Sequence, residues 1–445
     1  MHTCRNVRTL HNPRKKNFHG TLHINKKKNF PSIVSKKPRT KVKRTAQPAA
    51  QDQSNIPEID LGRAQKTVLD LLKIPGISGQ EKQVAEAIRK KLIDAGCSKN
   101  IISFDQAHKK TPLKGNCGNL IIKFPGTRKG PRRLLMAHMD TVPVCEGTKP
   151  VIRGDIVKSG NPATGLGADD RSGCGVVLST AIEILRQKID HPPLTFFFAI
   201  QEEVGLWGAR TVKATDLGKP KLAFNFDGGD VDKLTIGATG GERLDITIEG
   251  IPSHAGVAPE HGVSAIAIAS LAIASLHKDG WHGLVEKGSK RGTSNIGVIH
   301  GGAATNVVAE RATLRAEARG HDTAFRNRIV QAIEKAFKKA ANQVKSASGR
   351  KGTVSISKRL DYEAFRLTKN DPSITTAHRA LQALGHTPYY DISNGGLDAN
   401  WMAANGIPTV TLGCGQHDIH TTNEWLDLEA YKAACQTAIM LATMD

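Results

Sequence analysis

Two hydrophobic patterns follow one another along this chain. Between about residues 58 and 240, short apolar runs alternate with segments in which apolar residues recur at helical spacing. Such runs are typical of strands buried on both faces, and their alternation with helices favours a largely parallel sheet covered on both sides. We predict strands at residues 120–124, 134–137, 194–200 and 222–226, and helices at residues 80–95 and 175–186.

From residue 242 to about residue 358 the pattern changes to a βαββαβ order. We predict helices at residues 263–276 and 324–345, and strands at residues 243–249, 295–300, 312–318 and 353–357. After residue 360 the first pattern returns, with a helix at 374–384, a strand at 408–412 and a helix at 428–444. The order indicates that a small α/β domain is inserted into a larger one.

The chain therefore divides into four parts. Residues 1–56 form a basic extension, residues 57–241 and 359–445 form the larger domain, and residues 242–358 form the inserted one. A length of 445 residues fits two domains and an extension, since single domains usually hold about 100 to 200 residues. The contents of 39% hydrophobic and 23% charged residues are those of an ordinary globular protein.

The formal net charge of +22 is concentrated at the start of the chain. Residues 1–51 hold 14 Lys and Arg and no Asp or Glu, which leaves the remaining residues at only +8. A segment so basic and so poor in apolar residues is predicted to be disordered. A transit peptide, a polyanion-binding arm and a start codon assigned too far upstream are the alternatives. We expect no nucleic-acid partner apart from this arm.

The cysteines and the apolar runs indicate the compartment. Seven scattered cysteines without a CxxC motif predict reduced thiols in the cytoplasm. Cys414 is interpreted as a small buried residue, with a soft metal ligand as the alternative. No apolar stretch reaches the length of about 18 residues that a membrane span needs, and no secretory signal is recognisable. We expect a cytoplasmic protein without a membrane partner.

Residue types that bind divalent metals appear where the predicted strands end. Because ligands collect at the carboxyl ends of strands in open α/β sheets, we expect these side chains to converge. His138 and Asp140 lie two apart, so in extended backbone they point to one face and the carboxylate orients the imidazole. The full set comprises His138, Asp140, Asp169, Asp170, Glu202, Glu203, Asp227 and His420.

Each of these motifs also has a purely structural interpretation. Asp169 or Asp170 is a candidate helix N-cap, and Asp227 precedes two glycines in a potential turn. His420 and its neighbour His417 resemble ordinary loop histidines. The occurrence of all the motifs together nevertheless favours a centre for two divalent cations with one carboxylate left over as a base, which is the composition of a hydrolase site.

Five segments carry a resemblance to a known family: LLMAHMDTVP, GLGADDRSGCG, QEEVG, FDGGD and HDIHTTNEW. In this order and spacing they resemble the cocatalytic dizinc exopeptidases and deacylases, which include peptidase T, glutamate carboxypeptidase, aminoacylase and succinyl-diaminopimelate desuccinylase. The resemblance covers about residues 60–442. It implies an α/β catalytic domain with a mixed, mostly parallel sheet flanked by helices, and a ferredoxin-like βαββαβ insertion that acts as lid and dimerisation domain.

The resemblance also assigns roles to residues of the catalytic domain. It implies two zinc ions per subunit, with manganese or cobalt as alternatives, and a general base, Glu202. Asp140 orients the first ligand. Arg171 replaces the Lys that many members have near the bridging Asp. The implied ligands are Asp169 between the two metals, His138 and Asp227 on one, and Glu203 and His420 on the other.

In the lid, three residues match substrate-binding positions of the family. His254 lies in SHAGVAPEHGVSAI, and in relatives it reaches the substrate of the partner subunit, which implies a homodimer. Asn306 and Arg319 lie in GGAATNVVAERATLRAEAR and match residues that bind a substrate carboxylate or carbonyl.

The substrate class is less determined than the reaction. The stretch GGLDANWMAANGIPTVTLGCGQHDIHTTNEW is most similar to peptidase T, which implies a tripeptide aminopeptidase. The lid resembles glutamate carboxypeptidases equally well, so a carboxypeptidase or an N-acyl-amino-acid amidohydrolase is the alternative. From another class, a non-enzymatic binder that uses the basic arm, or a structural dimer without turnover, would be favoured by the loss of a ligand. None is lost.

Overall fold

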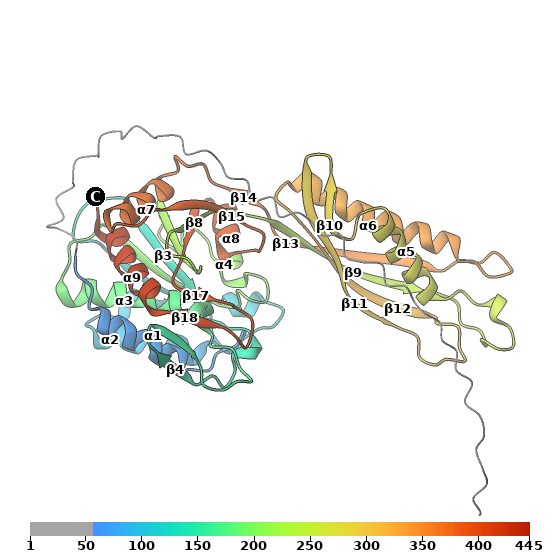
Figure 1. Cartoon of the computed structure of the whole chain (residues 1–445), viewed down its shortest axis with the longest axis horizontal. Helices are drawn as coiled ribbons and strands as arrows, with labels where there is room; N and C mark the ends of the chain where they lie inside the picture. Colours follow the sequence, from blue (N-terminus) through green and yellow to red (C-terminus); the bar gives the residue numbers. More distant parts are fainter. Residues whose placement is uncertain (1–56) are drawn as a thin grey trace, which may run out of the picture. The chain divides into compact units, whose positions relative to one another are not determined.

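The computed structural model describes residues 57–445, so the disordered extension expected at residues 1–56 lies outside the described residues. The larger part of the fold is built on a nine-stranded mixed sheet (Figure 1). Its strands are β1 Ile102–Phe104, β2 Leu120–Phe124, β3 Arg133–His138, β6 Leu194–Ala199, β7 Leu222–Phe226, β8 Lys233–Ala238, β14 Phe365–Arg366, β15 Tyr389–Ser393 and β16 Thr409–Leu412.

The centre of this sheet is parallel. The order is β1-β2-β6-β3-β7-β16-β8-β14, with β15 also paired to β8. The four central strands β6, β3, β7 and β16 run parallel to one another, whereas β2 and β8 join them antiparallel. Because parallel strands point their carboxyl ends to one edge, the loops after β3, β6 and β7 emerge together.

Helices cover both faces of the sheet. They are α1 Leu61–Leu72, α2 Lys82–Asp94, α3 Ala168–Gln187, α4 Trp207–Thr211, α7 Pro372–Ala383, α8 Asp398–Ala404 and α9 Leu428–Thr443. Every residue of β3 and β6 is buried, and alternate side chains enter different cores. Leu135 and Phe196 pack in the core that holds α1, α3 and α9, while Met136 and Phe197 pack with Ala209 of α4 and Met402 of α8.

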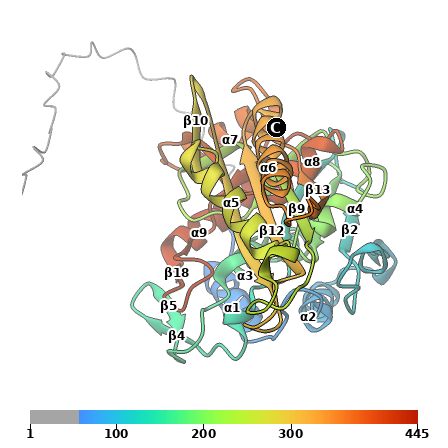
Figure 2. The same ribbon diagram turned by 90° about the vertical axis from the view of Figure 1, so that its right-hand side faces the viewer.

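A second sheet occupies the middle of the sequence. Its strands are β9 Gly240–Glu249, β10 Gly283–Lys287, β11 Lys290–Gly301, β12 Arg311–Gly320 and β13 Thr353–Tyr362, in the order β10-β11-β12-β9-β13 and all antiparallel. Helices α5 Ala265–Lys278 and α6 Thr323–Gln343 lie side by side on one face (Figures 1 and 2). A separate core between these helices and the sheet includes Leu244, Leu314, Ile329 and Phe337.

A small antiparallel sheet completes the fold. It has the order β17-β18-β5-β4 and consists of β4 Pro150–Arg153, β5 Ile156–Ser159, β17 Gln416–His417 and β18 Trp425–Asp427. Short 3-10 helices lie at Lys99–Ile101, Ala107–Lys110, Pro143–Cys145 and Pro259–His261. No helix between residues 57 and 445 is both long and apolar enough to span a bilayer. The six cysteines of this part are free and buried.

The predicted fold class, a mostly parallel α/β sheet flanked by helices, is confirmed, and strands β2 and β7 have the predicted bounds. Strands β1, β8, β14 and β15 of the nine-stranded sheet and the four strands of the small sheet were not predicted. The inserted unit contains the additional strand β10, which is short, lies at an edge and buries only Val285, so its alternation is too weak to recognise. Helix α3 spans Ala168–Gln187 and so starts before residue 175, but Asp169 (φ −81°, ψ 107°) and Asp170 (φ −118°, ψ 42°) form a non-helical kink near its start.

Candidate metal centre

The candidate ligands come from the carboxyl edge of the parallel strands and from two neighbouring loops. His138 is the last residue of β3, and Asp227 directly follows β7. Glu203 lies in the loop after β6, and Asp169 lies in the first turn of α3. His420 lies between β17 and β18 with φ 63°, a left-handed conformation that residues with a side chain rarely adopt. The structure brings all five together.

The carboxylate of Asp169 lies between the two histidines. Its Oδ1 is 3.1 Å from Nε2 of His138, and its Oδ2 is 3.2 Å from Nε2 of His420. Each oxygen of one carboxylate therefore faces a different imidazole. This is the arrangement required of a group that shares its two oxygens between two cations.

The remaining two carboxylates extend the arrangement on either side. Oδ1 of Asp227 lies 3.8 Å from Nε2 of His138, and Oε2 of Glu203 lies 2.9 Å from Nε2 of His420. Two sets of nitrogen and oxygen donors thus share Asp169. One set has His138 and Asp227, the other has His420 and Glu203.

Burial and mutual charge place these groups in an unusual electrostatic environment. Burial, followed by the negative charge of Asp169, raises the pKa of Asp227 well above its ordinary value. Burial alone would lower the pKa of His138, but hydrogen bonds to Asp140 and Asp169 raise it well above its usual range. Hydrogen bonds to Asp169 and Glu203 raise the pKa of His420 to about 10. Buried carboxylates gathered in this way need cations, and the donor set fits divalent metals.

Asp140 holds both the first histidine and the loop of the two glutamates. The Nδ1 atom of His138 is 3.1 Å from the backbone carbonyl of Asp140 and 3.5 Å from its Oδ1, so the carbonyl is the nearer partner. The Asp140 carboxylate accepts hydrogen bonds from the backbone amides of Glu202 at 2.9 Å and Glu203 at 3.2 Å, and from Oγ of Ser78 at 2.7 Å. It is fully buried, and its position fixes where the two glutamates emerge.

Glu202 differs from its neighbour in having no ion pair with a histidine in the described part of the chain. Burial raises its pKa well above the ordinary value, and the charges of Glu203 and Asp227 raise it further, while His138 opposes the shift. A carboxyl group with a raised pKa beside the donor cluster accepts and returns a proton more readily near neutral pH than an ordinary glutamate.

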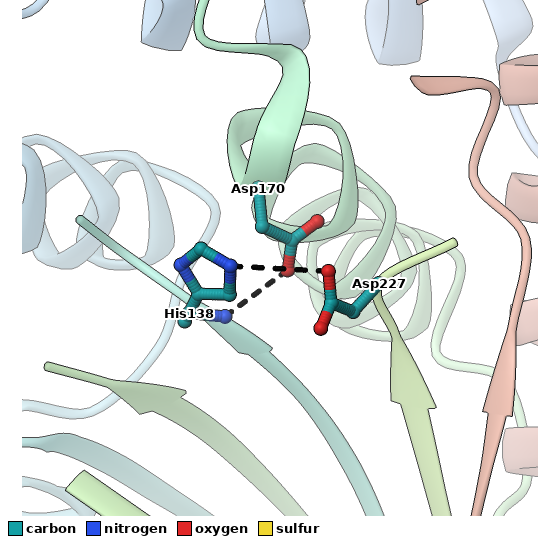
Figure 3. Close-up of side chains that lie close together, drawn as sticks. All are labelled: His138, Asp170 and Asp227. Carbon is teal, nitrogen blue, oxygen red and sulfur yellow. Dashed lines mark hydrogen bonds and ion pairs between the residues drawn. The ribbon is translucent and has the colours of Figure 1, made fainter. Parts of the chain in front are cut away.

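Asp170, an alternative to Asp169 in the sequence, has a different position (Figure 3). Its Oδ2 accepts the backbone amide of His138 at 3.1 Å, and its Oδ1 accepts that of Gly173 at 3.0 Å. Both oxygens therefore accept hydrogen bonds from backbone amides. One Asp170 oxygen also lies within 4.8 Å of a metal-binding atom of His138 and of Asp227. The geometry favours a bracing role for Asp170 beneath the strand end.

Glu424 supports the loop that carries Asp169. Its Oε1 accepts the backbone amide of Asp169 at 3.0 Å, and its Oε2 accepts that of Gly167 at 2.7 Å. Sγ of Cys145 donates to the same Oε2 at 3.2 Å. Glu424 lies four residues after His420, so one loop provides a candidate ligand and the support for another. That spacing is the sequence signal from which this residue was recognisable.

Gln416 supports Asp227 without a recognisable sequence signal. Its Nε2 donates to Oδ1 of Asp227 at 3.1 Å, and its Oε1 lies 3.1 Å from Oγ of Ser172, which fixes the amide orientation. Only the pairing of β17 with β18 brings Gln416 to this place.

Among the described residues, His417 and Cys414 form no hydrogen bond or ion pair with the five candidate ligands, although the Cys414 sulfur lies 3.7 Å from Oδ1 of Asp170. His417 stacks on Trp425, with ring centroids 4.2 Å apart and an interplanar angle of 18°. Cys414 is buried in the glycine-rich turn, where its sulfur lies 3.2 Å from Oγ of Ser172 and 3.4 Å from the carbonyl of Gly228. Both positions agree with the structural interpretation of these residues.

Asp398, the first residue of α8, is a buried acid that the sequence analysis did not single out. Among the described residues, neither of its carboxylate oxygens has a hydrogen-bond partner. Burial raises its pKa to about 7. The charge of His138 lowers this pKa, and the charge of Asp140 raises it. It therefore adds to the negative potential around the donor cluster.

The three lid residues lie in two separate places. His254 and Asn306 lie in two loops that contact each other, where the amide of Ala255 donates to the carbonyl of Asn306 at 2.9 Å. Nδ1 of His254 accepts the amides of Gly256 and Val257, both at 3.2 Å. Arg319 is at the other end of β12. There it forms a two-bond pair with Glu317, at 3.1 Å for each bond.

Comparison with known proteins agrees with this geometry. The model of peptidase family M20/M25/M40 matches residues 134–443. The uncharacterized protein YqjE of Bacillus subtilis is 32% identical over 81% of this chain and 92% of its own length. A tripeptidase from Staphylococcus aureus has a TM-score of 0.77 at 30% identity, covering 87% of this chain and 98% of its own. The aminopeptidase PepT from Bacillus cereus has a TM-score of 0.74 at 30% identity, covering 86% and 98%.

Proposed function

This chain belongs to peptidase family M20/M25/M40, and from that membership we propose that it is a zinc-dependent exopeptidase that removes the amino-terminal residue of short peptides, tripeptides above all. The predicted resemblance to this group of metallopeptidases, and to peptidase T within it, is confirmed. The observation that carries the proposal is the Asp169 carboxylate, which offers one oxygen toward each of two histidines. The tripeptidase and aminopeptidase relatives support the choice of substrate.

Two zinc ions fit the donors of this site. We assign Asp169 to both ions, His138 and Asp227 to one, and Glu203 and His420 to the other. The donors are nitrogen and oxygen atoms without a thiolate, which suits zinc and leaves manganese and cobalt as alternatives. When bound, such a pair of cations polarises the scissile carbonyl and lowers the pKa of water.

Glu202 is the proton carrier of the proposed reaction. Its carboxylate takes a proton from the attacking water and then delivers it to the nitrogen of the leaving amine, so the group ends as it began. Its raised pKa suits the second step, in which it acts as an acid. Asp140 fixes the backbone position of Glu202 by accepting a hydrogen bond from its amide at 2.9 Å.

The lid residues complete the site from two chains in this proposal. Arg319 lies at the carboxyl end of β12, and the loop of Asn306 precedes the amino end of the same strand. Arg311, the first residue of β12, is eight residues before Arg319, which corresponds to about 26 Å at the usual strand rise. One substrate of tripeptide size cannot contact both ends of the same strand. We therefore propose a homodimer in which Arg319 serves its own subunit and His254 and Asn306 serve the neighbouring one.

The tautomer of His254 fits such a role. Because Nδ1 accepts two backbone amides, the ring proton is on Nε2, which is free to donate outward from an exposed loop. A donor of this kind stabilises negative charge that develops on a carbonyl oxygen. Arg319 uses Nε and one Nη for Glu317, so its second Nη is free for a substrate carboxylate.

We also propose a cytoplasmic location. The six free cysteines of residues 57–445 agree with the reduced thiols expected there. Attachment of a fluorescent protein to the full chain, followed by cell fractionation, tests this.

The decisive experiment compares three matched substrates with the zinc-loaded enzyme: a free tripeptide, its N-acetyl derivative and its C-terminal amide. We expect rapid cleavage of the free tripeptide at its first bond and slow cleavage of the acetylated one. Equal rates for the free and acetylated peptides would refute the aminopeptidase function and favour an amidohydrolase. Loss of activity only with the C-terminal amide, combined with release of the last residue, would identify a carboxypeptidase.

A non-enzymatic function through the basic arm is tested separately. Binding to a polyanion is measured at several salt concentrations, with and without residues 1–51. Salt-dependent binding that disappears with the arm, together with no hydrolysis of any substrate above, would support the binding function instead.

A further inference from the structure

A cluster of arginines lies on the face of the second sheet that α5 and α6 leave uncovered. Arg243 of β9 and Arg359 of β13 are direct cross-strand partners. Both donate from Nε to the carboxylate of Asp361, Arg359 at 3.1 Å. The Asp361 side chain is 6% exposed, whereas those of Arg243 and Arg359 are 51% and 46% exposed. One buried acid thus binds the Nε atoms of two half-exposed guanidinium groups. It does not engage their Nη atoms.

This arrangement leaves positive charge uncompensated. Like charges on directly opposed residues of an antiparallel pair repel each other. Asp361 offsets only one of the two. Arg315 of β12 lies directly opposite Asp245 and Arg243 directly opposite Glu317, but Arg315 forms no ion pair with any residue between 57 and 445. Glu317 is already engaged through both oxygens by Arg319, which leaves Asp245 as the nearby acid without a salt bridge among these residues. Four guanidinium groups therefore face three carboxylates.

The arginines line a hollow. A groove of about 390 Å³ is bordered by Arg243, Arg315 and Arg359 together with Asn295 of β11. The acids Asp245 and Glu317 also border it. The three arginines come from three different strands, so the groove presents an anion with N–H groups from several sides.

The groove adjoins the residue that is proposed to hold the substrate. Arg319 is the next outward-facing residue after Glu317 along β12, about 7 Å further at the usual rise for two residues. Its cross-strand partner, Gly241, pairs in turn with Tyr362. The pKa of Tyr362, raised mainly by burial, responds both to Arg319 and to Glu202. Nε1 of Trp401 in α8 donates to the carbonyl of Asp361 at 3.0 Å, so the arginine row contacts the catalytic domain.

We propose that Arg243, Arg315 and Arg359 bind the side-chain carboxylate of an acidic residue at the carboxyl end of the substrate, beside the α-carboxylate at Arg319. The inference rests on the proposed function and narrows it to peptides that end in glutamate or aspartate. Asn295 contributes a neutral polar edge to the groove. The Nη groups that are not engaged by Asp361 donate to a carboxylate, which accepts more hydrogen bonds than an amide of the same shape.

The test uses two tripeptides that differ only in this group, Ala-Ala-Glu and Ala-Ala-Gln. We expect the zinc-loaded wild-type enzyme to prefer Ala-Ala-Glu. In Arg315→Gln, kcat/KM for Ala-Ala-Glu falls by about tenfold, through KM, while that for Ala-Ala-Gln is unchanged. Arg359→Gln gives the same selective loss, and Arg315→Gln is the cleaner variant because Arg315 does not support Asp361. Arg350→Gln, an exposed lid arginine outside the groove, is the matched control and changes neither value.

The outcomes separate this inference from the proposed function. If the wild type cleaves both tripeptides equally and Arg315→Gln changes neither, the aminopeptidase stands and the arginine site is refuted. If the wild type cleaves neither, the proposed function fails and the inference falls with it. Inorganic phosphate is the second probe. Inhibition by phosphate that Arg315→Gln relieves, without any preference for Ala-Ala-Glu, would show an anion site of another kind and overturn the proposal.

Discussion

The metal-binding region and the lid hold their functional residues in different ways. In the catalytic part, the side chains of Glu424, Gln416 and Asp140 support the candidate ligands Asp169, Asp227 and Glu203, whereas His420 lies in an exposed loop. In the lid, the candidate residues lie on exposed loops and on the open face of a sheet. In the proposed function, the chemistry is assigned to one edge of the sheet, whereas substrate selection is assigned to residues spread over a surface that the proposed homodimer brings together.

The largest expected effect concerns the centre itself. We expect Glu202→Gln to retain both metals and its thermal stability but to lose activity by about 10²- to 10⁴-fold, because the amide cannot accept the water proton. Metal content and kcat are measured together. Glu146→Gln, an exposed glutamate in the loop after Pro143–Cys145, is the control. Turnover in Glu202→Gln equal to that of the control would remove Glu202 from the mechanism.

The second prediction asks whether the lid acts across two chains. His254→Ala is expected to lower kcat by about 100-fold, since it deletes one oxyanion donor. When His254→Ala is mixed with Glu202→Gln and the subunits exchange, one site in each mixed dimer has both residues intact. Activity should then return to about a quarter of the wild-type value at random exchange of equal amounts.

The mixing experiment has a clear negative result. If His254 acted within its own chain, no mixed dimer would contain an intact site, and the mixture would be as inactive as its parts. A monomeric wild-type enzyme in solution would likewise contradict the shared site. Sedimentation of the wild type and of both variants is the accompanying measurement.

A smaller effect is expected from the support of Asp169. Glu424→Gln replaces one acceptor oxygen by an amide nitrogen, which opposes a backbone N–H of either Gly167 or Asp169. Metal affinity should fall by about 10- to 100-fold, as for other residues that orient ligands. Titration of the apoprotein with zinc measures it, independently of activity. Glu429→Gln, exposed on α9, is the matched control, and equal affinities in the two variants would refute the supporting role.

The smallest effect concerns the connection to the lid. Burial raises the pKa of Glu363, but hydrogen bonds and charge from Arg326 of α6 outweigh it and hold the pKa below its ordinary value. A lowered folded pKa gives stability that is present above the unfolded pKa and is lost as pH falls through the folded pKa. Because the Glu363 side chain is 41% exposed, Glu363→Gln should cost less than about 1 kcal/mol at neutral pH.

That cost should disappear in acid. Urea unfolding of the apoprotein near pH 7 and near pH 3 measures the difference between Glu363→Gln and the wild type at each pH. Glu86→Gln, which removes an exposed pair with Arg89 on α2, is the comparison. A difference that grows on acidification would show that the carboxylate is not stabilised by Arg326 in the folded protein.

The sequence by itself determined the fold class and the set of candidate ligands. Strands such as β2 and β7 are uninterrupted apolar runs, so their bounds follow from local pattern alone. His138 and Asp227 follow such runs directly, and their convergence is predictable because ligands gather at the carboxyl ends of parallel strands. Strand β10 escaped prediction because an edge strand with one buried residue has almost no pattern to read.

Only the tertiary structure decided which side chains form hydrogen bonds and ion pairs with one another. The contacts of Asp169 with both histidines, the support of Asp227 by Gln416, and the pairing of Arg243 with Arg359 through Asp361 all join segments far apart in the sequence. The physical reason is that a local pattern reports burial, which is a property of one segment. Hydrogen bonds and ion pairs depend on distance and direction between two segments, and these are set by the packing of the whole chain.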